Sequence, residues 1–241
     1  MKTPRTQKGF TLIELLVVIG IIALLASIAL PAFSSVQVKA QQTKALNNAK
    51  QIGFACKAYA TDNNGQYPSY PTTSGSTNTA SEVTTSNDAF NDLIPTYLQT
   101  IQCFFQAGSH ETPGTKASPD PDFTTVGSQT AATALPTGSN HWAYVTGMSD
   151  TSNSSYPLIA DNPASVGPPA TWASDPTKAG GVWKGKQVIV VHVDDSASVD
   201  QLNSTFSDMT GPTGIDLFDT TGQKGWMSGG AGAGNIFVPV K

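Results

Sequence analysis

The sequence predicts an α+β fold, in which one long N-terminal α-helix packs on a small antiparallel β-sheet with long irregular loops. Three observations lead to this prediction. Apolar residues recur at helical spacing over the first quarter of the 241 residues, and short runs rich in β-branched and aromatic residues occupy the second half. The stretches between them consist mostly of Ser, Thr, Asn, Gly and Pro. Helix and strand patterns that segregate along the chain in this way are typical of α+β domains.

The helix is expected to begin in an apolar run, residues 12–30 (LIELLVVIGIIALLASIAL), which carries a single charged residue, Glu14. These nineteen residues, at 1.5 Å rise each, span about 30 Å, the thickness of the hydrocarbon core of a bilayer. Lys2, Arg5 and Lys8 precede the run. Because basic residues accumulate on the cytoplasmic side of membrane helices, we expect a cytoplasmic N-terminus and the rest of the chain outside.

Three interpretations of this segment compete. The segment is either a secretory signal peptide, or a plain single-pass anchor, or a short leader followed by an apolar run. In the third case the leader is cut off and the apolar run stays on the mature chain. Glu14 favours the third, because a carboxylate in an apolar run costs about 2.5–3.5 kcal/mol on insertion scales. In a filament that cost has a use: a free amine at Phe10 of one subunit pairs with Glu14 of its neighbour and sets the axial register.

The segment KGFTLIE (Lys8–Glu14) resembles the prepilin signal of type IV pilins and type II secretion pseudopilins. The resemblance implies that a membrane aspartyl peptidase cuts between Gly9 and Phe10 and N-methylates Phe10. It also implies an assembly role for Glu14 and a kinked or locally melted helix at Pro31. The expected partners are the prepilin peptidase/methyltransferase, further copies of the chain in a filament, and a secretion or pilus assembly platform.

Beyond the apolar run the helical pattern continues with an apolar stripe at Leu46, Ala49, Ile52, Cys56 and Tyr59. The cluster Asp62-Asn63-Asn64-Gly65 predicts the end of the helix, since Gly adopts a positive φ there. We interpret Cys56 as a small buried core residue; the alternative is a disulfide with Cys103. The segment YATDNNGQYP (59–68) also resembles the end of this helix in the major, G-type pseudopilin.

The composition divides the chain into four parts. They are a leader (1–9), the long helix (10–63, with 10–33 in the membrane or filament core), a variable loop region (64–140) and a β-rich C-terminal part (141–241). Within the loop region, residues 69–88 and 107–140 have loop composition, and residues 89–106 are expected to form a short helix and an extended piece.

Three short strands are expected in the C-terminal part, in HWAYVTG (141–147), YPLIAD (156–161) and QVIVVHV (187–193). The third is the clearest, because it is rich in β-branched residues and ends at Asp194-Asp195, which we interpret as a turn. Residues 185–202 weakly resemble the closing hairpin of pilin-like proteins, with Asp195-Ser196 in place of the usual Asp-Gly turn.

The stretch GIDLFDTTGQKGWMSGG (214–230) resembles the C-terminal calcium loop of major pseudopilins. Calcium takes six to eight oxygen ligands, and Asp216 and Asp219 are the only carboxylates nearby. Calcium is therefore the candidate cofactor, held by these two residues. The alternative is a glycine-rich surface loop.

Charge and motifs exclude several functions. The formal net charge is −4, and without the leader ten basic residues face seventeen acidic ones, which gives −7. No basic patch remains, so a nucleic-acid partner is not expected. His110, His141 and His192 lack metal-ligand spacing, and residues 180–186 have P-loop spacing but precede a strand rather than a helix.

The sequence therefore predicts a structural subunit rather than an enzyme, namely a type II secretion pseudopilin of the major type. It is expected in the inner membrane with a periplasmic C-terminal domain, and then in a periplasmic or extracellular filament. The alternative is a surface type IV pilus subunit for adhesion or DNA uptake. A different class is a membrane-anchored enzyme or carbohydrate-binding module, with a glycan surface formed by Trp142, Trp172, Trp183 and Trp226.

Overall fold

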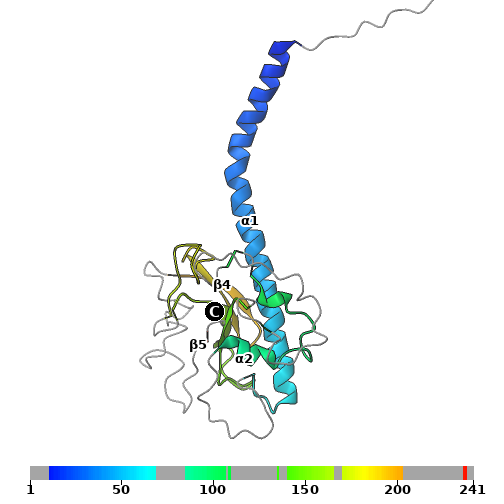
Figure 1. Cartoon of the computed structure of the whole chain (residues 1–241), viewed down its shortest axis with the longest axis vertical. Helices are drawn as coiled ribbons and strands as arrows, with labels where there is room; N and C mark the ends of the chain where they lie inside the picture. The colour runs from blue at the N-terminus through cyan, green and yellow to red at the C-terminus, as the bar shows by residue number, and fades with distance from the viewer. Residues whose placement is uncertain are drawn as a thin grey trace, which may run out of the picture. The chain divides into compact units, whose positions relative to one another are not determined.

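The computed structural model (Figure 1) describes residues 11–68, 85–106, 108–109, 135, 140–165, 170–202 and 236–237. The chain divides into an N-terminal unit, Met1–Gln41, and a C-terminal unit, Gln42–Lys241. Helix α1 (Leu12–Asp62) contributes residues to both units.

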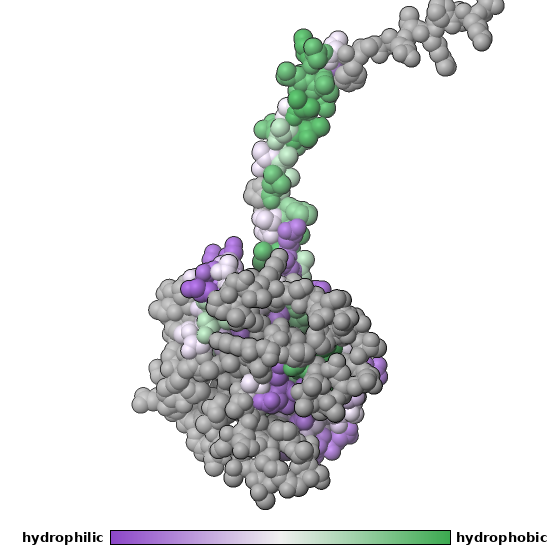
Figure 2. All heavy atoms as spheres, in the orientation of Figure 1, coloured by the Kyte–Doolittle hydropathy of each residue, from purple (hydrophilic) through white to green (hydrophobic). Residues whose placement is uncertain are grey.

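In the N-terminal unit, residues 12–30 of α1 are apolar on every side except for Glu14 and Ser27. Large apolar side chains from Leu12 to Val38 are exposed, and Figure 2 shows hydrophobic residues along the visible face of this helix. Among the described residues, α1 is the one helix long and apolar enough to cross a membrane. A helix that is hydrophobic on every side needs an apolar environment around it.

The helical backbone is unbroken through Pro31. Proline has no N–H to donate to the carbonyl four residues earlier, at Ser27, and its ring crowds that carbonyl. The kink that we expect at Pro31 therefore stays a prediction about the helix in its membrane or filament.

In the C-terminal unit, α1 is amphipathic and buries the stripe that the sequence predicts. Ala49, Ile52 and Cys56 have no exposed surface, Tyr59 is buried, and Leu46 is partly buried. The helix ends where the Asp-Asn-Asn-Gly cluster predicts. The N–H of Gly65, at φ +78°, donates to the Ala60 carbonyl over 2.8 Å, which satisfies an acceptor at the helix end.

Within the described residues, five antiparallel strands form one sheet in the order β4-β3-β2-β1-β5, which confirms the predicted α+β class. The three predicted strands are present with slightly shorter bounds. The strands are β1 (Trp142–Val145), β2 (Pro157–Asp161), β3 (Gln187–His192), β4 (Ala197–Gln201) and β5 (Ile236–Phe237).

Strand β3 lies against α1. A Cβ added at Gly53 would lie 3.0 Å from Cγ1 of Val191, so the two backbones approach closely at that point. The residues on the other face of β3, Val188 and Val190, are also fully buried. Burial on both faces explains why β3 is a continuous apolar run rather than an alternating one.

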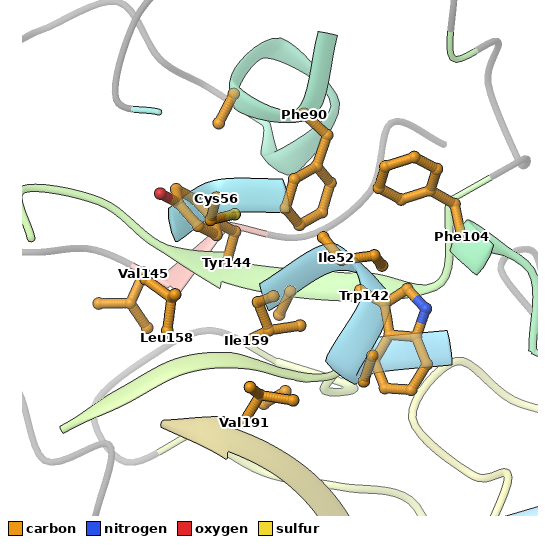
Figure 3. Packing of buried hydrophobic residues seen from close by; sticks show 14 of the residues in the cluster. Ile52, Cys56, Phe90, Phe104, Trp142, Tyr144, Val145, Leu158, Ile159 and Val191 are labelled. Carbon is orange, nitrogen blue, oxygen red and sulfur yellow. The ribbon is translucent and has the colours of Figure 1, made fainter. Parts of the chain in front are cut away.

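Two short elements add aromatic rings to the core: α2 (Ser86–Asn91) and the 3-10 helix η1 (Gln102–Phe104). The ring centroids of Phe90 and Phe104 are 5.0 Å apart, and those of Phe90 and Tyr144 are 5.2 Å apart. Figure 3 shows Phe90 and Phe104 on the same side of the core as Ile52 of α1 and Trp142 of β1. These contacts join α2, η1, α1 and β1 in one apolar core.

The predicted loop over residues 69–88 is wrong at its C-terminal end, because α2 begins at Ser86. Thr85 and Asp88 form a capping box: the Asp88 N–H donates to Thr85 Oγ1 and the Thr85 N–H donates to Asp88 Oδ2. A Thr-x-x-Asp pattern is a helix-start signal, and the polar composition of this stretch concealed it.

Candidate assembly site

Glu14 lies in the first turn of α1 and is held by Thr11. The Thr11 N–H donates to Glu14 Oε2 over 2.9 Å, and the Thr11 hydroxyl donates to the same oxygen over 2.8 Å. The Glu14 N–H donates back to Thr11 Oγ1 over 3.3 Å. This is a capping box, which satisfies two of the N–H groups that a helix start leaves without partners.

The sequence analysis missed Thr11, although the Thr-x-x-Glu spacing of residues 11–14 indicates such a cap. Thr11 fixes the direction of the Glu14 carboxylate and compensates part of its cost in an apolar run. Its two donors both reach Oε2, so among the described residues Oε1 has no hydrogen-bond donor. One carboxylate oxygen is thus left for a donor outside this part of the chain.

Gly9 and Phe10, the predicted cleavage and methylation positions, lie outside the described residues, as do Asp216 and Asp219 of the predicted calcium loop. In the ranges that the structure describes, no group of three or more His, Cys, Asp or Glu side chains is arranged to hold a metal ion. Cleavage, methylation and calcium binding therefore stay predictions.

Cys56 and Cys103 are both buried free thiols. The Cys103 thiol donates to the Thr100 carbonyl over 3.6 Å. Burial raises the pKa of Cys103 to about 12 and raises the pKa of Cys56 well beyond the ordinary thiol value. The thiolate form that attacks disulfides is therefore scarce at both positions, and the Cys56–Cys103 disulfide stays a prediction.

Three of the four tryptophans considered for a glycan surface are core residues. Trp142, Trp172 and Trp183 are at most 7% exposed. Their indole N–H groups all donate inside the protein: to the Cys103 carbonyl (3.0 Å), the Asp161 carbonyl (3.3 Å) and Asp161 Oδ2 (2.8 Å), respectively. Trp226 lies outside the described residues. A binding surface built on the three described tryptophans is thus excluded.

Asp161, at the end of β2, is a buried carboxylate that the sequence analysis did not single out. Its Oδ2 accepts from the Ile189 N–H (2.6 Å) and the Trp183 indole, and its Oδ1 accepts from the Gln106 amide (2.5 Å). Burial raises its pKa to about 6, although these three donors lower it. The carboxylate joins three separate segments of the chain to the end of β2, and its role is structural.

Comparison with known proteins identifies the N-terminal segment. Residues 4–30 match the family model described as the prokaryotic N-terminal methylation motif. The chain is 44% identical over 69 residues to a fimbrial protein of Neisseria meningitidis, which covers 29% of this chain and 40% of that protein. It is 43% identical over 53 residues to the type IV major pilin protein PilA of Myxococcus xanthus, 22% of this chain and 24% of that one.

A third relative belongs to a different machine. The chain is 42% identical over 69 residues to the type II secretion system core protein G of Aeromonas hydrophila, which covers 29% of this chain and 46% of that protein. The chain thus spans less than half the length of the curated relatives it matches. No solved structure matches the chain. The chain carries the N-terminal methylation motif of prepilins and, over 22–29% of its length, resembles type IV pilins and a type II secretion core protein.

Proposed function

We propose that this chain is a structural subunit of a type IV pilus-like filament that polymerises through α1. The observation that carries the proposal is the start of α1. There a carboxylate in an otherwise apolar, exposed helix is oriented by Thr11 and keeps one oxygen without a donor among the described residues. The match to the N-terminal methylation motif supports the same role.

In this proposal the chain is inserted in the inner membrane with its N-terminus in the cytoplasm and the C-terminal unit in the periplasm. The prepilin peptidase cuts between Gly9 and Phe10 and methylates the new amine of Phe10. An assembly platform then moves the subunit from the bilayer into the filament. Both environments are apolar, so the helix keeps its apolar surface covered throughout.

Glu14 and Phe10 supply specificity to this transfer. The N-methylated amine of one subunit donates to the carboxylate of its neighbour, and each charge compensates the other in the apolar core of the filament. A helix that is displaced along its neighbour by one turn, about 5.4 Å, loses that pair and leaves two charges uncompensated. The ion pair therefore selects one axial register.

Among such filaments we propose the pseudopilus of type II secretion. The resemblance of residues 59–68 and 214–230 to the major pseudopilin and the similarity to core protein G support this choice. The alternative is a surface pilus subunit, which the similarity to the fimbrial protein and to PilA supports. Long surface fibres that contain this chain would favour the pilus, and genes for a secretin and a secretion ATPase beside its own would favour the pseudopilus.

The decisive experiment replaces Glu14 by Ala in cells that assemble the filament. We expect Glu14→Ala to insert in the membrane and be cleaved normally but to enter no filaments. The matched control, Val18→Ala, shortens a side chain in the same helix without removing a charge and should assemble. Normal filaments of Glu14→Ala would refute the register argument.

Mass spectrometry of the mature chain tests the processing step separately. The expected N-terminal residue is Phe10 with one added methyl group. Any other start, in particular one beyond residue 30, would contradict the proposed cleavage and with it the filament role of α1.

A further inference from the structure

The sequence contains one Asn-Gly pair, Asn64-Gly65, which lies just beyond the last residue of α1. In such a pair the backbone nitrogen of the glycine attacks the side-chain amide carbon of the asparagine. Glycine favours this attack more than any other residue, because it has no Cβ to crowd the nitrogen. The two adjacent residues thus hold a nucleophile and an electrophile, and the reaction needs no enzyme.

Asn64 is exposed, and its side chain forms no hydrogen bond within the described residues. Two other asparagines are held more firmly. The Asn63 amide donates to the Tyr59 carbonyl over 2.8 Å, and Asn63 is half-buried. Asn153 Oδ1 accepts from the N–H and the hydroxyl of Ser155 over 3.0 and 2.9 Å. Of these three asparagines, only Asn64 combines a following glycine with an exposed side chain that water and hydroxide reach.

The backbone of Gly65 closes the end of α1. The Gly65 N–H donates to the Ala60 carbonyl over 2.8 Å, and the Gly65 carbonyl accepts from the Asp150 N–H over 2.8 Å. The Gly65 nitrogen must lose its proton before it attacks, and this proton lies in the hydrogen bond to Ala60. The reaction therefore requires that the helix end first opens and releases the Gly65 N–H.

The chemistry consumes one water molecule and releases one ammonia molecule. Hydroxide removes the proton from the Gly65 nitrogen, which then forms a bond to Cγ of Asn64. The bond between Cγ and Nδ2 breaks, and the amide nitrogen leaves as ammonia with a proton from water. Water opens the resulting succinimide ring at either carbonyl. One opening leaves an aspartate at position 64, and the other leaves an isoaspartate, in which the main chain runs through the side chain.

We infer that Asn64 is a site of spontaneous deamidation and that opening of the α1 end controls its rate. The ends of helices open at a smaller free-energy cost than their middles. One hydrogen bond of ordinary strength shifts such an opening equilibrium about two- to tenfold. The bonds of Gly65 to Ala60 and Asp150 therefore slow the reaction about tenfold relative to the unfolded chain, without preventing it. The reaction is the same whether or not the chain assembles into a filament.

The product adds negative charge where negative charge is already present. The Asp150 carboxylate lies against Gly65, since a Cβ added at Gly65 would be 2.5 Å from Asp150 Oδ1. Asp62, two residues before Asn64, is exposed at the end of α1. A further carboxylate at position 64 is repelled by both, and it also lies at a helix C-terminus, where the helix dipole disfavours negative charge.

The isoaspartate form disturbs the join between α1 and the following segment as well. Gln66 and Ser149 form an antiparallel bridge, and the Tyr67 N–H donates to the Met148 carbonyl over 3.2 Å. Tyr67 is buried, and its hydroxyl donates to the Val193 carbonyl over 3.1 Å. An isoaspartate lengthens the main chain at position 64 and shifts this pairing. Deamidation therefore loosens the end of α1 in chains that have aged.

Incubation of the full chain in detergent at mildly alkaline pH, followed by peptide mapping with mass spectrometry, tests the inference. Chromatography separates the amide, aspartate and isoaspartate forms at position 64, and an isoaspartyl methyltransferase labels the last of them. We expect both acidic products to form faster at Asn64 than at Asn63 or Asn153. The same chain unfolded in guanidinium chloride should react about tenfold faster at Asn64.

Two variants provide matched tests. Asn64→Gln keeps an amide but must form a larger ring, so the products at this position should disappear. Asn63→Ala removes the bond to Tyr59 that helps to close the helix end. It should speed the reaction of Asn64 about two- to tenfold in the folded chain and leave the rate in the unfolded chain unchanged. An unchanged rate in folded Asn63→Ala would contradict control by the helix end.

Three further outcomes would overturn the inference. The first is an equal rate at Asn64 in the folded and unfolded chains. The second is faster conversion at Asn63 or Asn153 than at Asn64 in the folded chain. The third is the absence of product at Asn64 in the folded chain after about a hundred half-times of the unfolded chain, because two hydrogen bonds do not provide that much protection.

Discussion

At the scale of single residues, Thr11 is a positioning residue for Glu14. We predict that Thr11→Val, which removes the hydroxyl that donates to Glu14 Oε2, weakens the helix start by about 0.5–2 kcal/mol and lowers filament yield without abolishing it. Thr11→Ser keeps the hydroxyl and should assemble normally. Quantitative immunoblotting of sheared filaments measures the yield, and an unchanged yield for Thr11→Val would show that Glu14 does not need the Thr11 hydroxyl.

Asp161 makes stability depend on pH. Its pKa is raised to about 6 in the folded chain, against an ordinary value of 3.8, so the folded state holds the proton more tightly than the unfolded state. The resulting stabilisation is fully present below about pH 4 and is lost as the pH rises through 6. One pKa unit corresponds to about 1.4 kcal/mol, so this group accounts for at most about 3 kcal/mol.

We therefore predict that the free energy of unfolding falls between pH 4.5 and pH 7.5, measured by urea titration with tryptophan fluorescence. Asp92, whose pKa burial raises to about 7, titrates in the same direction. The matched comparison is Asp161→Asn, which cannot ionise and should have a shallower pH dependence than the wild type. The variant should also be about 1–3 kcal/mol less stable near pH 4.5, because its amide N–H₂ faces donors. The same pH dependence in both proteins would contradict the assignment to Asp161.

At the scale of elements, the β3–β4 hairpin contacts α1 through the ion pair between Lys57 and Asp195 and through the close approach of Val191 to Gly53. His192 and Ser196 close a three-residue loop: the Asp195 N–H donates to the His192 carbonyl, the His192 N–H donates to the Ser196 carbonyl, and Asp195 has φ +64°. Such loops place a residue with positive φ at the third position. Here that residue is Asp195, which bonds Lys57 of α1 over 3.0 Å.

We predict that Lys57→Met lowers the stability of the C-terminal unit by about 1–2 kcal/mol. The side chain of Asp195 is only 10% exposed, so it would lose its partner in a poorly solvated position, whereas the half-exposed Lys57 limits the value of the pair itself. Lys50→Met is the control for loss of a lysine from the same helix. In the Lys57→Met background, Asp195→Gly should restore most of the loss, since glycine readily adopts a positive φ. No recovery would mean that the carboxylate is not the source of the loss.

Gly53 allows the helix to approach the hairpin. A leucine there would meet Cγ1 of Val191, which lies 3.0 Å from the position of a Cβ. We predict that Gly53→Leu lowers the thermal midpoint, because overpacking costs about 1–3 kcal/mol and outweighs the gain of about 1 kcal/mol in helix propensity. Differential scanning calorimetry measures the change, and a raised midpoint would show that α1 and β3 separate easily.

The end of α1 and strand β3 could be predicted from the sequence because both depend on local chemistry. Gly65 indicates the end of the helix, and the run of β-branched residues indicates the strand. The start of helix α2 was not predicted because Ser86 and Asn87 are polar residues that burial and tertiary hydrogen bonds hold in place. For example, the Asn87 amide donates to the Leu135 carbonyl over 2.9 Å. Asp161 was not singled out from the sequence for the same reason, because its hydrogen-bond donors come from residues far away along the chain.

The candidate site divides in the same manner. Glu14 could be singled out from the sequence because a lone charge in an apolar run stands out, and its proposed role requires no knowledge of the fold. Thr11 did not stand out, because a threonine before an apolar run is common and its two hydrogen bonds to Glu14 Oε2 are known only from the structure.

At the scale of the whole molecule, the two units meet different demands. In the described part of the N-terminal unit no residue belongs to the apolar core, and large apolar side chains are exposed from Leu12 to Val38. The core runs from Ala45 to Val193 and lies within the C-terminal unit. Among the large apolar side chains exposed in the described residues, only Phe54 belongs to the C-terminal unit. We therefore expect the residues up to Gln41 to make the full chain insoluble in water, and the residues from Gln42 onward to determine its folding stability.

We predict that residues 42–241, produced without the first 41, form a soluble monomer that unfolds cooperatively, whereas the full chain needs detergent or lipid. A single exposed phenylalanine is normal on a soluble surface and should not drive association. Analytical ultracentrifugation and urea unfolding measure the two properties. A shorter fragment that begins at residue 54 provides the comparison, since it lacks Ala45, Ala49 and Ile52 and should not fold. Aggregation of the 42–241 fragment would mean that the apolar half of α1 is needed to complete the fold, and the helix would then be more than an anchor and assembly element.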